Sequence, residues 1–270
     1  VFYFWKYKIE VNNLNFLKYY NIKLKMEFLE SLKTHTDNIK TFNNAFTVKV
    51  YETFTLEVLK DTKNLKLKLD LVTEEINEYL QAVKTNDIIE IRDAISDILY
   101  VTIGYFLYLG KDIISIYEEF CRNNSFETKE YDDTFNITYD KLSLEVLKNK
   151  DLIENVSTVL NKYLKQLQKS TKEKNPMVIV NSLCHLLFIT YSIGKCFGID
   201  VNSDFDIVHR SNMSKICSSE KEATSTMMKY KNDERYPETY YVKNDFGYVV
   251  RNKANNKVLK SINYTPAKFN

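Results

Sequence analysis

The stretch TEEINEYLQAVKTNDIIEIRDAISDIL, from Thr73 to Leu99, decides the fold. Apolar residues recur with helical periodicity on both sides of KTND (Lys84 to Asp87), which predicts one helix over about 65–83 and another over about 88–109. A linker this short makes the two helices antiparallel neighbours. Acidic residues three apart share a helix face. The hairpin should therefore bring four carboxylates together, those of Glu75, Glu78, Glu90 and Asp93.

The composition favours an all-α protein. The 270 residues include only Gly 5 and Pro 3, while 44% are hydrophobic, which disfavours turn-rich β folds and favours long helices. A net charge of +2 predicts no nucleic-acid partner. The longest apolar run, residues 98–110, is too short to span a bilayer, which predicts no membrane partner. Four cysteines without paired spacing indicate reduced thiols and a cytoplasmic protein.

Much of the pattern occurs twice. TLEVLKDTKNL (55–65) is similar to SLEVLKNKDLI (143–153), and DILYVTIGYFLYLGKD (97–112) to HLLFITYSIGKCFGID (185–200), each at a separation of 88 residues. INEYLQAV (76–83) is similar to LNKYLKQL (160–167), at a separation of 84. A diverged internal duplication explains these matches. We expect an N-terminal extension over 1–40, repeats over 41–127 and 128–230, and a tail over 231–270 with a short hairpin turning at NDFG.

The acidic residues are confined to the first copy. In this alignment Glu75, Glu78, Glu90, Asp93 and Asp97 correspond, in that order, to Val159, Lys162, Val178, Asn181 and His185. The apolar frame persists without the acids, so the fold does not require them. Paired acids on a helix more often form a solvated face. Their joint loss within an apolar frame favours a chemical role in the first copy, although Asp97 could instead cap a helix or pair with Arg92 or a Lys.

Four carboxylates on facing helices form an oxygen-only donor set, which suits Mg²⁺ or Mn²⁺ rather than zinc. Burying this much negative charge is costly unless a cation neutralises it. A Mg²⁺ ion usually keeps open positions that phosphate oxygens occupy. The pattern therefore predicts a phosphorylated substrate, whose phosphoryl oxygen the metal would polarise while it supplies a water of lowered pKa.

These motifs resemble a known superfamily. EEINE (Glu74 to Glu78) and EIRD (Glu90 to Asp93) are similar to the EExxE…ExxD signature of the all-α nucleoside triphosphate pyrophosphohydrolases, which include MazG, phosphoribosyl-ATP pyrophosphohydrolase and the dimeric dUTPases. FNNAFTVKVYET (42–53), FDIVHRSNMSK (205–215) and KVLKSINYTPA (257–267) extend the resemblance, which is to a phage-type MazG-like branch, over most of the chain from about residue 41.

The resemblance implies an all-α bundle that builds its site by dimerisation and hydrolyses a nucleotide to monophosphate and pyrophosphate with Mg²⁺. The metal ligands would be Glu75, Glu78, Glu90 and Asp93, and Glu74 or Glu75 would assist catalysis or activate water. Substrate contacts would come from Asp97, His209, Arg210, Asn212 and Lys215. Because the family dimer is here a fused pair, we expect an internal pseudo-dimer, with metal held by the first copy and cations supplied by the second.

A second class of function stays open. HRSNMSK (209–215) could be a cation-rich helix end that offsets the helix dipole. The acid-less second copy also fits a catalytically weak relative that binds a nucleotide or a partner protein. Two pseudo-dimeric chains could further associate as a homodimer. No motif in the sequence specifies the base or sugar of the nucleotide.

Overall fold

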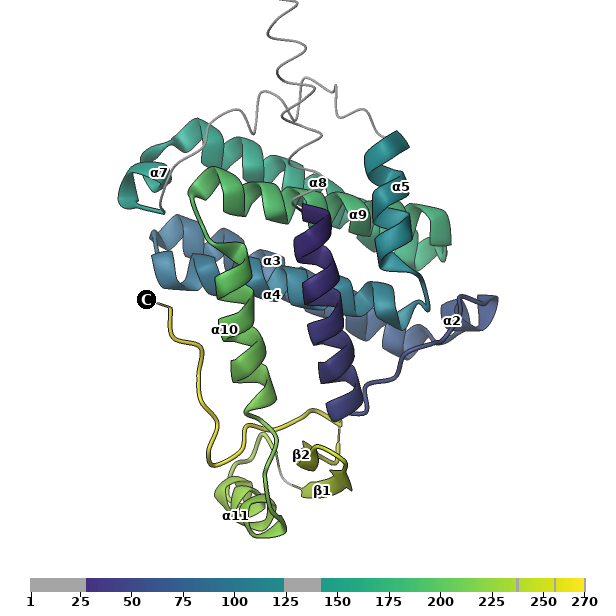
Figure 1. Cartoon of the computed structure of the whole chain (residues 1–270), viewed down its shortest axis with the longest axis vertical. Coiled ribbons are helices and arrows are strands. Elements are labelled where there is room, and N and C mark those ends of the chain that lie inside the picture. The colour runs from purple at the N-terminus through teal and green to yellow at the C-terminus, as the bar shows by residue number, and fades with distance from the viewer. Residues whose placement is uncertain (1–27, 124–141, 237, 255, 270) are drawn as a thin grey trace, which may run out of the picture.

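The structure, a computed structural model, describes residues 28–123, 142–236, 238–254 and 256–269. The α3–α4 and α8–α9 helix pairs form two layers, and α10 and an unlabelled helix over residues 28–45 cross the α3–α4 pair (Figure 1). The all-α prediction is confirmed. The labelled elements are α2 (Leu56–Lys60), α3 (Thr62–Thr85), α4 (Ile88–Tyr108), α5 (Ile113–Asn123), α7 (Leu144–Lys148), α8 (Lys150–Glu173), α9 (Pro176–Phe197), α10 (Val201–Met213), α11 (Glu220–Tyr230), β1 (Thr239–Asn244) and β2 (Gly247–Asn252).

The α3–α4 hairpin forms as predicted, with α3 two to three residues longer at each end. Asn86 ends α3 in the left-handed conformation, and its backbone N–H bonds to the carbonyls of Ala82 and Val83. Asp87 then caps α4, accepting hydrogen bonds from the backbone N–H groups of Ile89 and Glu90. Two polar residues thus satisfy both helix ends, so the chain reverses within a single turn.

The helices of the second half follow those of the first at a fixed spacing. α2 and α7 have the same sequence, LEVLK, and α2, α3, α4 and α5 each begin 88 residues before α7, α8, α9 and α10. The α3 cap Asp61 likewise precedes the α8 cap Asn149 by 88 residues. The separation of 84 that the sequence suggested for α3 and α8 is therefore wrong. In the corrected alignment Glu75 and Glu78 correspond to Tyr163 and Gln166, rather than to Val159 and Lys162.

The two halves share one hydrophobic core. A single cluster of buried side chains joins the helix over 28–45 with α2–α5 and α7–α10. The predicted N-terminal extension ended at residue 40, but this helix crosses that boundary and buries Leu32, His35 and Ile39 in the core. It belongs to the bundle because its inner face is apolar. The predicted boundary between the repeats, at residues 127 and 128, lies outside the described residues.

The apolarity of α9 is explained by its place in the core. By length and composition α9 could cross a membrane, as could α4 and α5 together if their bend of 108° belonged to one span. In α9, however, 72% of the most apolar window is buried inside the bundle. Cys184, Cys196 and Cys217 are buried free thiols, as predicted, whereas Cys121 is only half-buried.

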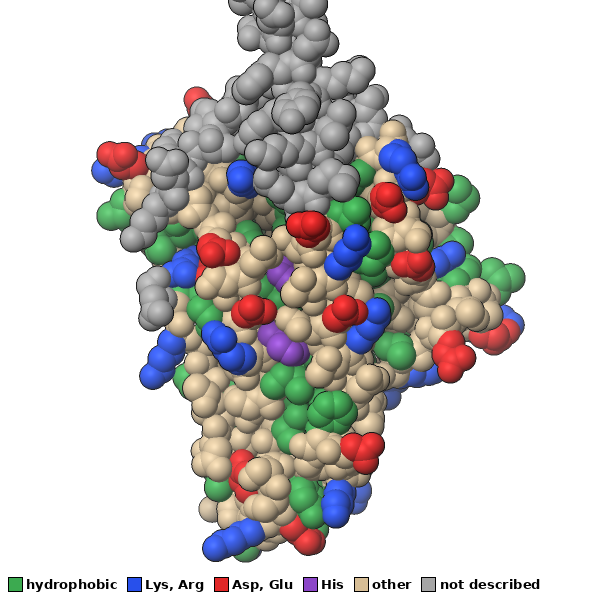
Figure 2. All heavy atoms as spheres, viewed as in Figure 1, with side chains coloured by type: hydrophobic (Ala, Val, Ile, Leu, Met, Phe, Trp, Pro, Cys, Tyr) green, Lys and Arg blue, Asp and Glu red, His purple; other side chains and the backbone are tan. Residues whose placement is uncertain are grey.

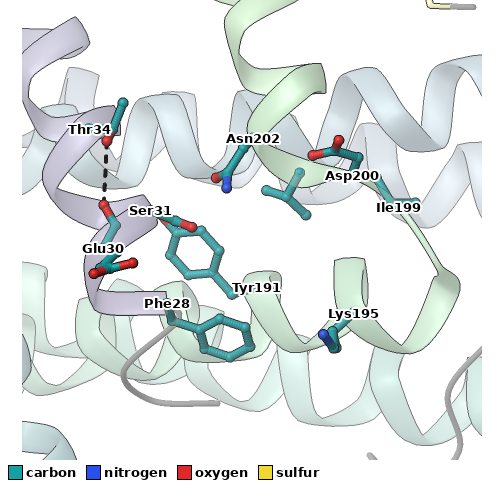
Figure 3. A pocket seen from close by; sticks show the side chains of 10 residues that line it. Phe28, Glu30, Ser31, Thr34, Tyr191, Lys195, Ile199, Asp200 and Asn202 are labelled. Carbon is teal, nitrogen blue, oxygen red and sulfur yellow. Dashed lines mark hydrogen bonds between the residues drawn. The ribbon is translucent and has the colours of Figure 1, made fainter. Parts of the chain in front are cut away.

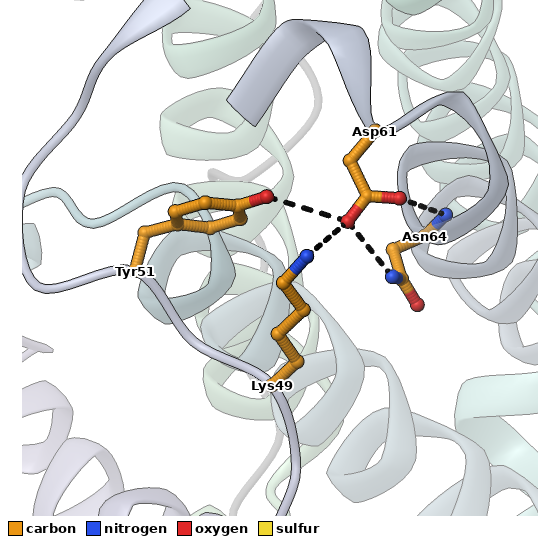
Figure 4. Close-up of polar contacts among 4 residues, drawn as sticks. All are labelled: Lys49, Tyr51, Asp61 and Asn64. Carbon is orange, nitrogen blue, oxygen red and sulfur yellow. Dashed lines mark hydrogen bonds and ion pairs between the residues drawn. The ribbon is translucent and has the colours of Figure 1, made fainter. Parts of the chain in front are cut away.

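Asp61 ties the loop before α2 to the start of α3 (Figure 4). Its carboxylate accepts hydrogen bonds from Lys49 Nζ at 2.6 Å, Tyr51 Oη at 3.3 Å and Asn64 Nδ2 at 2.9 Å. Asp61→Ala should lower the free energy of unfolding by about 1–2 kcal/mol, because the cap is lost. Asp61→Asn should cost less than about 1 kcal/mol, because Asn149 caps α8 in the same way and the ion pair with exposed Lys49 is weak. Urea unfolding of both variants checks this, and equal losses would contradict it.

His35 makes the fold sensitive to acid. Its ring stacks on Phe205 at 3.8 Å and its Nδ1 lies 2.9 Å from Tyr191 Oη, while burial lowers its pKa from 6.5 to about 3. Below pH 6.5 the unfolded chain takes up a proton that folded His35 does not. His35 should thus cost up to about 1.4 kcal/mol of stability per pH unit between pH 6.5 and 3. In His35→Phe, stability should fall less steeply with acid than in wild type, and parallel curves would contradict this.

The C-terminal part forms a small cap below the bundle. β1 and β2 pair antiparallel from Thr239↔Asn252 to Asn244↔Gly247, and the turn lies at NDFG as predicted. The hairpin is fixed to the end of the helix over 28–45, since Asn244 Nδ2 donates to Ala45 O at 2.7 Å and Arg251 donates to the carbonyl of Phe46. After β2, residues 256–269 run back along α10 toward the start of α4 (Figure 1).

Candidate functional site

The predicted acids gather on the facing sides of α3 and α4. Glu75, Asp93 and Asp97 are half-buried, whereas Glu74, Glu78 and Glu90 are exposed. Burial raises the pKa of Glu75 to about 8, with smaller contributions from the charges of Asp97, Glu78, Glu74 and Asp93. The four carboxylates predicted as metal ligands therefore share one region with Asp97.

Three more carboxyl groups, those of Asp97, Asp93 and Glu78, have raised pKa values. Burial and then the charge of Asp93 raise the pKa of Asp97 to about 7. Burial, followed by the charges of Glu90 and Glu78, raises the pKa of Asp93. Burial, followed by the charges of Glu74 and Glu90, raises the pKa of Glu78. Each carboxyl disfavours the charge of its neighbours, so the cluster is electrostatically incomplete without a cation.

Lys215 from the second half lies across from these acids. It follows the end of α10, and its Nζ donates a hydrogen bond to Asn212 Oδ1. Burial lowers its pKa, which the negative charges of Asp97 and Glu75 partly offset. The structure thus brings together the predicted residues Asn212 and Lys215 with acids more than a hundred residues earlier in the chain.

The remaining predicted contacts are less closely tied to the acids. His209 Nδ1 lies 3.1 Å from Tyr100 Oη, and burial lowers the pKa of its ring. Tyr100 follows Asp97 by three residues on α4, so His209 contacts α4 about one turn beyond Asp97. Arg210 is exposed on α10. The backbone carbonyl of Arg210 accepts a hydrogen bond from the N–H of Ser214.

An ion pair that the sequence did not predict joins α4, which carries Glu90, Asp93 and Asp97, to α10. Arg92, beside Asp93 on α4, donates to both carboxylate oxygens of fully buried Asp204 on α10, at 2.8 Å and 2.6 Å. A two-point contact of this kind fixes orientation as well as distance. The sequence left open a pairing of Arg92 with Asp97. In the structure Arg92 instead binds Asp204 and so holds α10 against α4. Two isolated charges 112 residues apart gave no sequence signal of pairing.

The second half has other residues at the equivalent positions, 88 residues later. At the positions of Glu75 and Asp97 stand Tyr163 and His185, whose rings stack at 3.9 Å and 15°. Phe120 meets the His185 ring edge-on at 4.8 Å. Burial and the charge of Lys162 lower the pKa of His185 to about 4. Aromatic packing therefore occupies the place where the first half has carboxylates.

As they stand, the acids do not form a closed metal cluster. Within the described ranges, no three His, Cys, Asp or Glu side chains are close enough to hold a metal ion. The donors nevertheless suit Mg²⁺, because they are all carboxylates, all four are at least partly exposed, and their mutual repulsion favours a divalent cation between them.

A separate cavity lies away from these acids. It has a volume of about 490 Å³ and is lined by the helix over 28–45, α9 and the start of α10, including Tyr191, Lys195 and Asn202 (Figure 3). None of the predicted site residues lines it. On the face shown in Figure 2, acidic and basic side chains are interspersed rather than gathered into a patch of one sign. That distribution gives no support for a nucleic-acid surface on this face.

Comparison with known proteins links this geometry to a family. The family described as phosphoribosyl-ATP pyrophosphohydrolase matches residues 39–124, which contain all the acids of α3 and α4. An uncharacterized protein, L479, of Acanthamoeba polyphaga mimivirus is 31% identical over 252 residues, which cover 87% of this chain and 94% of the relative. That match extends beyond the first half of the chain. No solved structure matches.

Proposed function

The chain belongs to the phosphoribosyl-ATP pyrophosphohydrolase family, among the MazG-like all-α nucleoside triphosphate pyrophosphohydrolases, and from this we infer what its site does. The family assigns it a pyrophosphohydrolase activity on phosphoric anhydrides. We propose that the substrate is a nucleoside or deoxynucleoside triphosphate, cleaved to monophosphate and pyrophosphate with Mg²⁺ or Mn²⁺. The observation that carries this proposal is the acid cluster of α3 and α4 facing Lys215.

Each side of the site has a distinct task in this proposal. Glu75, Glu78, Glu90 and Asp93 would hold the metal, and exposed Glu74 would orient or deprotonate the attacking water. The bound metal would polarise a phosphoryl oxygen and lower the pKa of that water. Lys215, positioned by Asn212, would neutralise phosphate charge on the opposite side. Asp97 would keep Lys215 charged and aimed at the acids.

We propose one such site per chain. The second half replaces Glu75 and Asp97 by stacked Tyr163 and His185, so it cannot supply a second set of carboxylates. The segment that follows α10 instead contributes Lys215 to the first half, next to the contact between α4 and α10 that Arg92 and Asp204 fix. In this reading the internal duplication replaces a symmetric dimer, with one half specialised for metal and the other for phosphate.

Product analysis tests the activity. The protein should be incubated with each NTP and dNTP, and with phosphoribosyl-ATP, in Mg²⁺ or Mn²⁺, and the phosphorus products separated. The proposal expects monophosphate and pyrophosphate in equal amounts from at least one substrate, and none when the metal is chelated. Release of single orthophosphate, or turnover that persists in chelator, would contradict it.

The alternative is a nucleotide-binding protein without turnover, favoured by the acid-less second half. A ligand that binds only the folded chain raises the melting temperature, whether or not it is cleaved. A melting temperature that rises with nucleotide and Mg²⁺, without any product over hours, would support this alternative.

A further inference from the structure

The C-terminal segment over residues 256–269, which we call the strap, contacts both α4 and the end of α10. Ser261 Oγ donates to Ser214 O at 2.9 Å, and the N–H of Thr265 donates to Ser214 Oγ at 2.9 Å. Ser214 immediately precedes Lys215. At its far end, the Phe269 ring lies 5.0 Å from the guanidinium of Arg92, the residue before Asp93. The strap therefore contacts both the chain at the end of α10 and the first half of α4 (Figure 1).

The strap carries three exposed lysines, Lys257, Lys260 and Lys268, and the first two act on the charge of Lys215. Lys260 Nζ lies 4.6 Å over the ring of Tyr264, and the hydroxyl of Tyr264 is hydrogen-bonded to Ser211 Oγ on α10 at 2.9 Å. Lys260 is thus directed toward the end of α10 where Asn212 and Lys215 lie. Its backbone is fixed as well, since Tyr230 Oη donates to Lys260 O at 3.0 Å.

Backbone hydrogen bonds to β2 fix the position of Lys257. Its carbonyl accepts from the N–H of Asn252 at 2.9 Å, and Leu259, which is buried, donates its N–H to Val250 O at 2.9 Å. These ladder contacts fix the first turn of the strap to β2. Lys257 and Lys260 both act on the charge of Lys215, and Lys260 also acts on that of Asp93. Lys257 and Lys260 therefore lie near Lys215, and Lys215 and Lys260 lie near the acids.

Three like charges held in one place favour an anion between them. Lysine ammonium groups bind phosphate oxygens as point charges. We propose that Lys257 and Lys260 of the strap join Lys215 in a clamp for the phosphate chain of the substrate, formed by Ser214 and Phe269 holding the strap across the site. This inference rests on the proposed function and adds two binding residues to it.

Binding of a phosphate chain tests the clamp. The probe is inorganic tripolyphosphate with Mg²⁺, titrated calorimetrically into wild type and into Lys257→Gln, Lys260→Gln and the double variant. Each single change should weaken binding about tenfold, the size of one charge-assisted contact, and the double change more than either. Lys260→Arg should keep most of the affinity, and Lys253→Gln, an exposed lysine paired with Glu238, should bind like wild type.

The same variants in the turnover assay separate the two proposals. The clamp expects KM for the nucleotide to rise in the Gln variants while kcat changes less. If wild type binds tripolyphosphate and cleaves nucleotide, but the double variant does both equally well, the clamp is wrong and the proposed function stands. If wild type neither binds the probe nor cleaves any nucleotide, both are wrong.

Discussion

Glu78→Gln should lower kcat/KM for pyrophosphate release by at least about a hundredfold, because it removes one carboxylate donor from the metal site. Glu78 extends from α3 toward Glu90 of α4 and is exposed, so the amide can be accommodated without repacking the core. Stopped-time assays of pyrophosphate with a saturating metal concentration measure the loss.

Two controls separate metal binding from folding. Asp70→Asn alters another exposed acid of α3, one paired with Lys66, and should leave turnover unchanged. The melting temperature of metal-free Glu78→Gln should equal or exceed that of wild type, because one repelling charge has been removed from the cluster. A variant that keeps wild-type turnover would exclude Glu78 as a ligand.

Lys215→Met should lower kcat/KM by about ten- to a hundredfold, because the cation that faces Asp97 and Glu75 is lost from the phosphate side of the site. The methionine fills similar space, so the bundle should still fold. Steady-state kinetics over a range of nucleotide concentrations measure the effect on both kcat and KM.

Charge is the property at issue, so Lys215→Arg should recover part of the lost activity. Lys221→Met, at an exposed position on α11, should leave it intact. Unchanged turnover and substrate affinity in Lys215→Met would refute a site shared between the two halves. In that case the second half would serve only as packing for the first.

Most of the fold follows from local patterns. The α3–α4 hairpin was predictable because its apolar period is long and Asn86 and Asp87 satisfy both helix ends. The alignment of α8 was not, because a four-residue shift also places apolar residues on one helix face. The helix starts and the caps at Asp61 and Asn149 distinguish the two registers. The helix over 28–45 was missed because its buried His35 interrupts an apolar face.

The candidate site, like the fold, could be predicted from the sequence only in part. Acids three apart on one helix are visible in sequence, so the α3 and α4 carboxylates were predictable as a group. The contribution of α10 followed from the family resemblance rather than from spacing. The Arg92–Asp204 pair and the strap lysines were not foreseen, since single charges separated by a hundred or more residues leave no periodic signal.

Binding of Mn²⁺ tests most directly whether the α3 and α4 carboxylates hold a metal. Free Mn²⁺ gives an electron paramagnetic resonance signal that weakens when the ion is bound to protein. With nucleotide present, wild type should bind Mn²⁺ through one acid cluster per chain, and Glu78→Gln should leave the signal close to that of buffer with nucleotide alone. Equal Mn²⁺ binding by the two proteins would contradict a metal site at these acids.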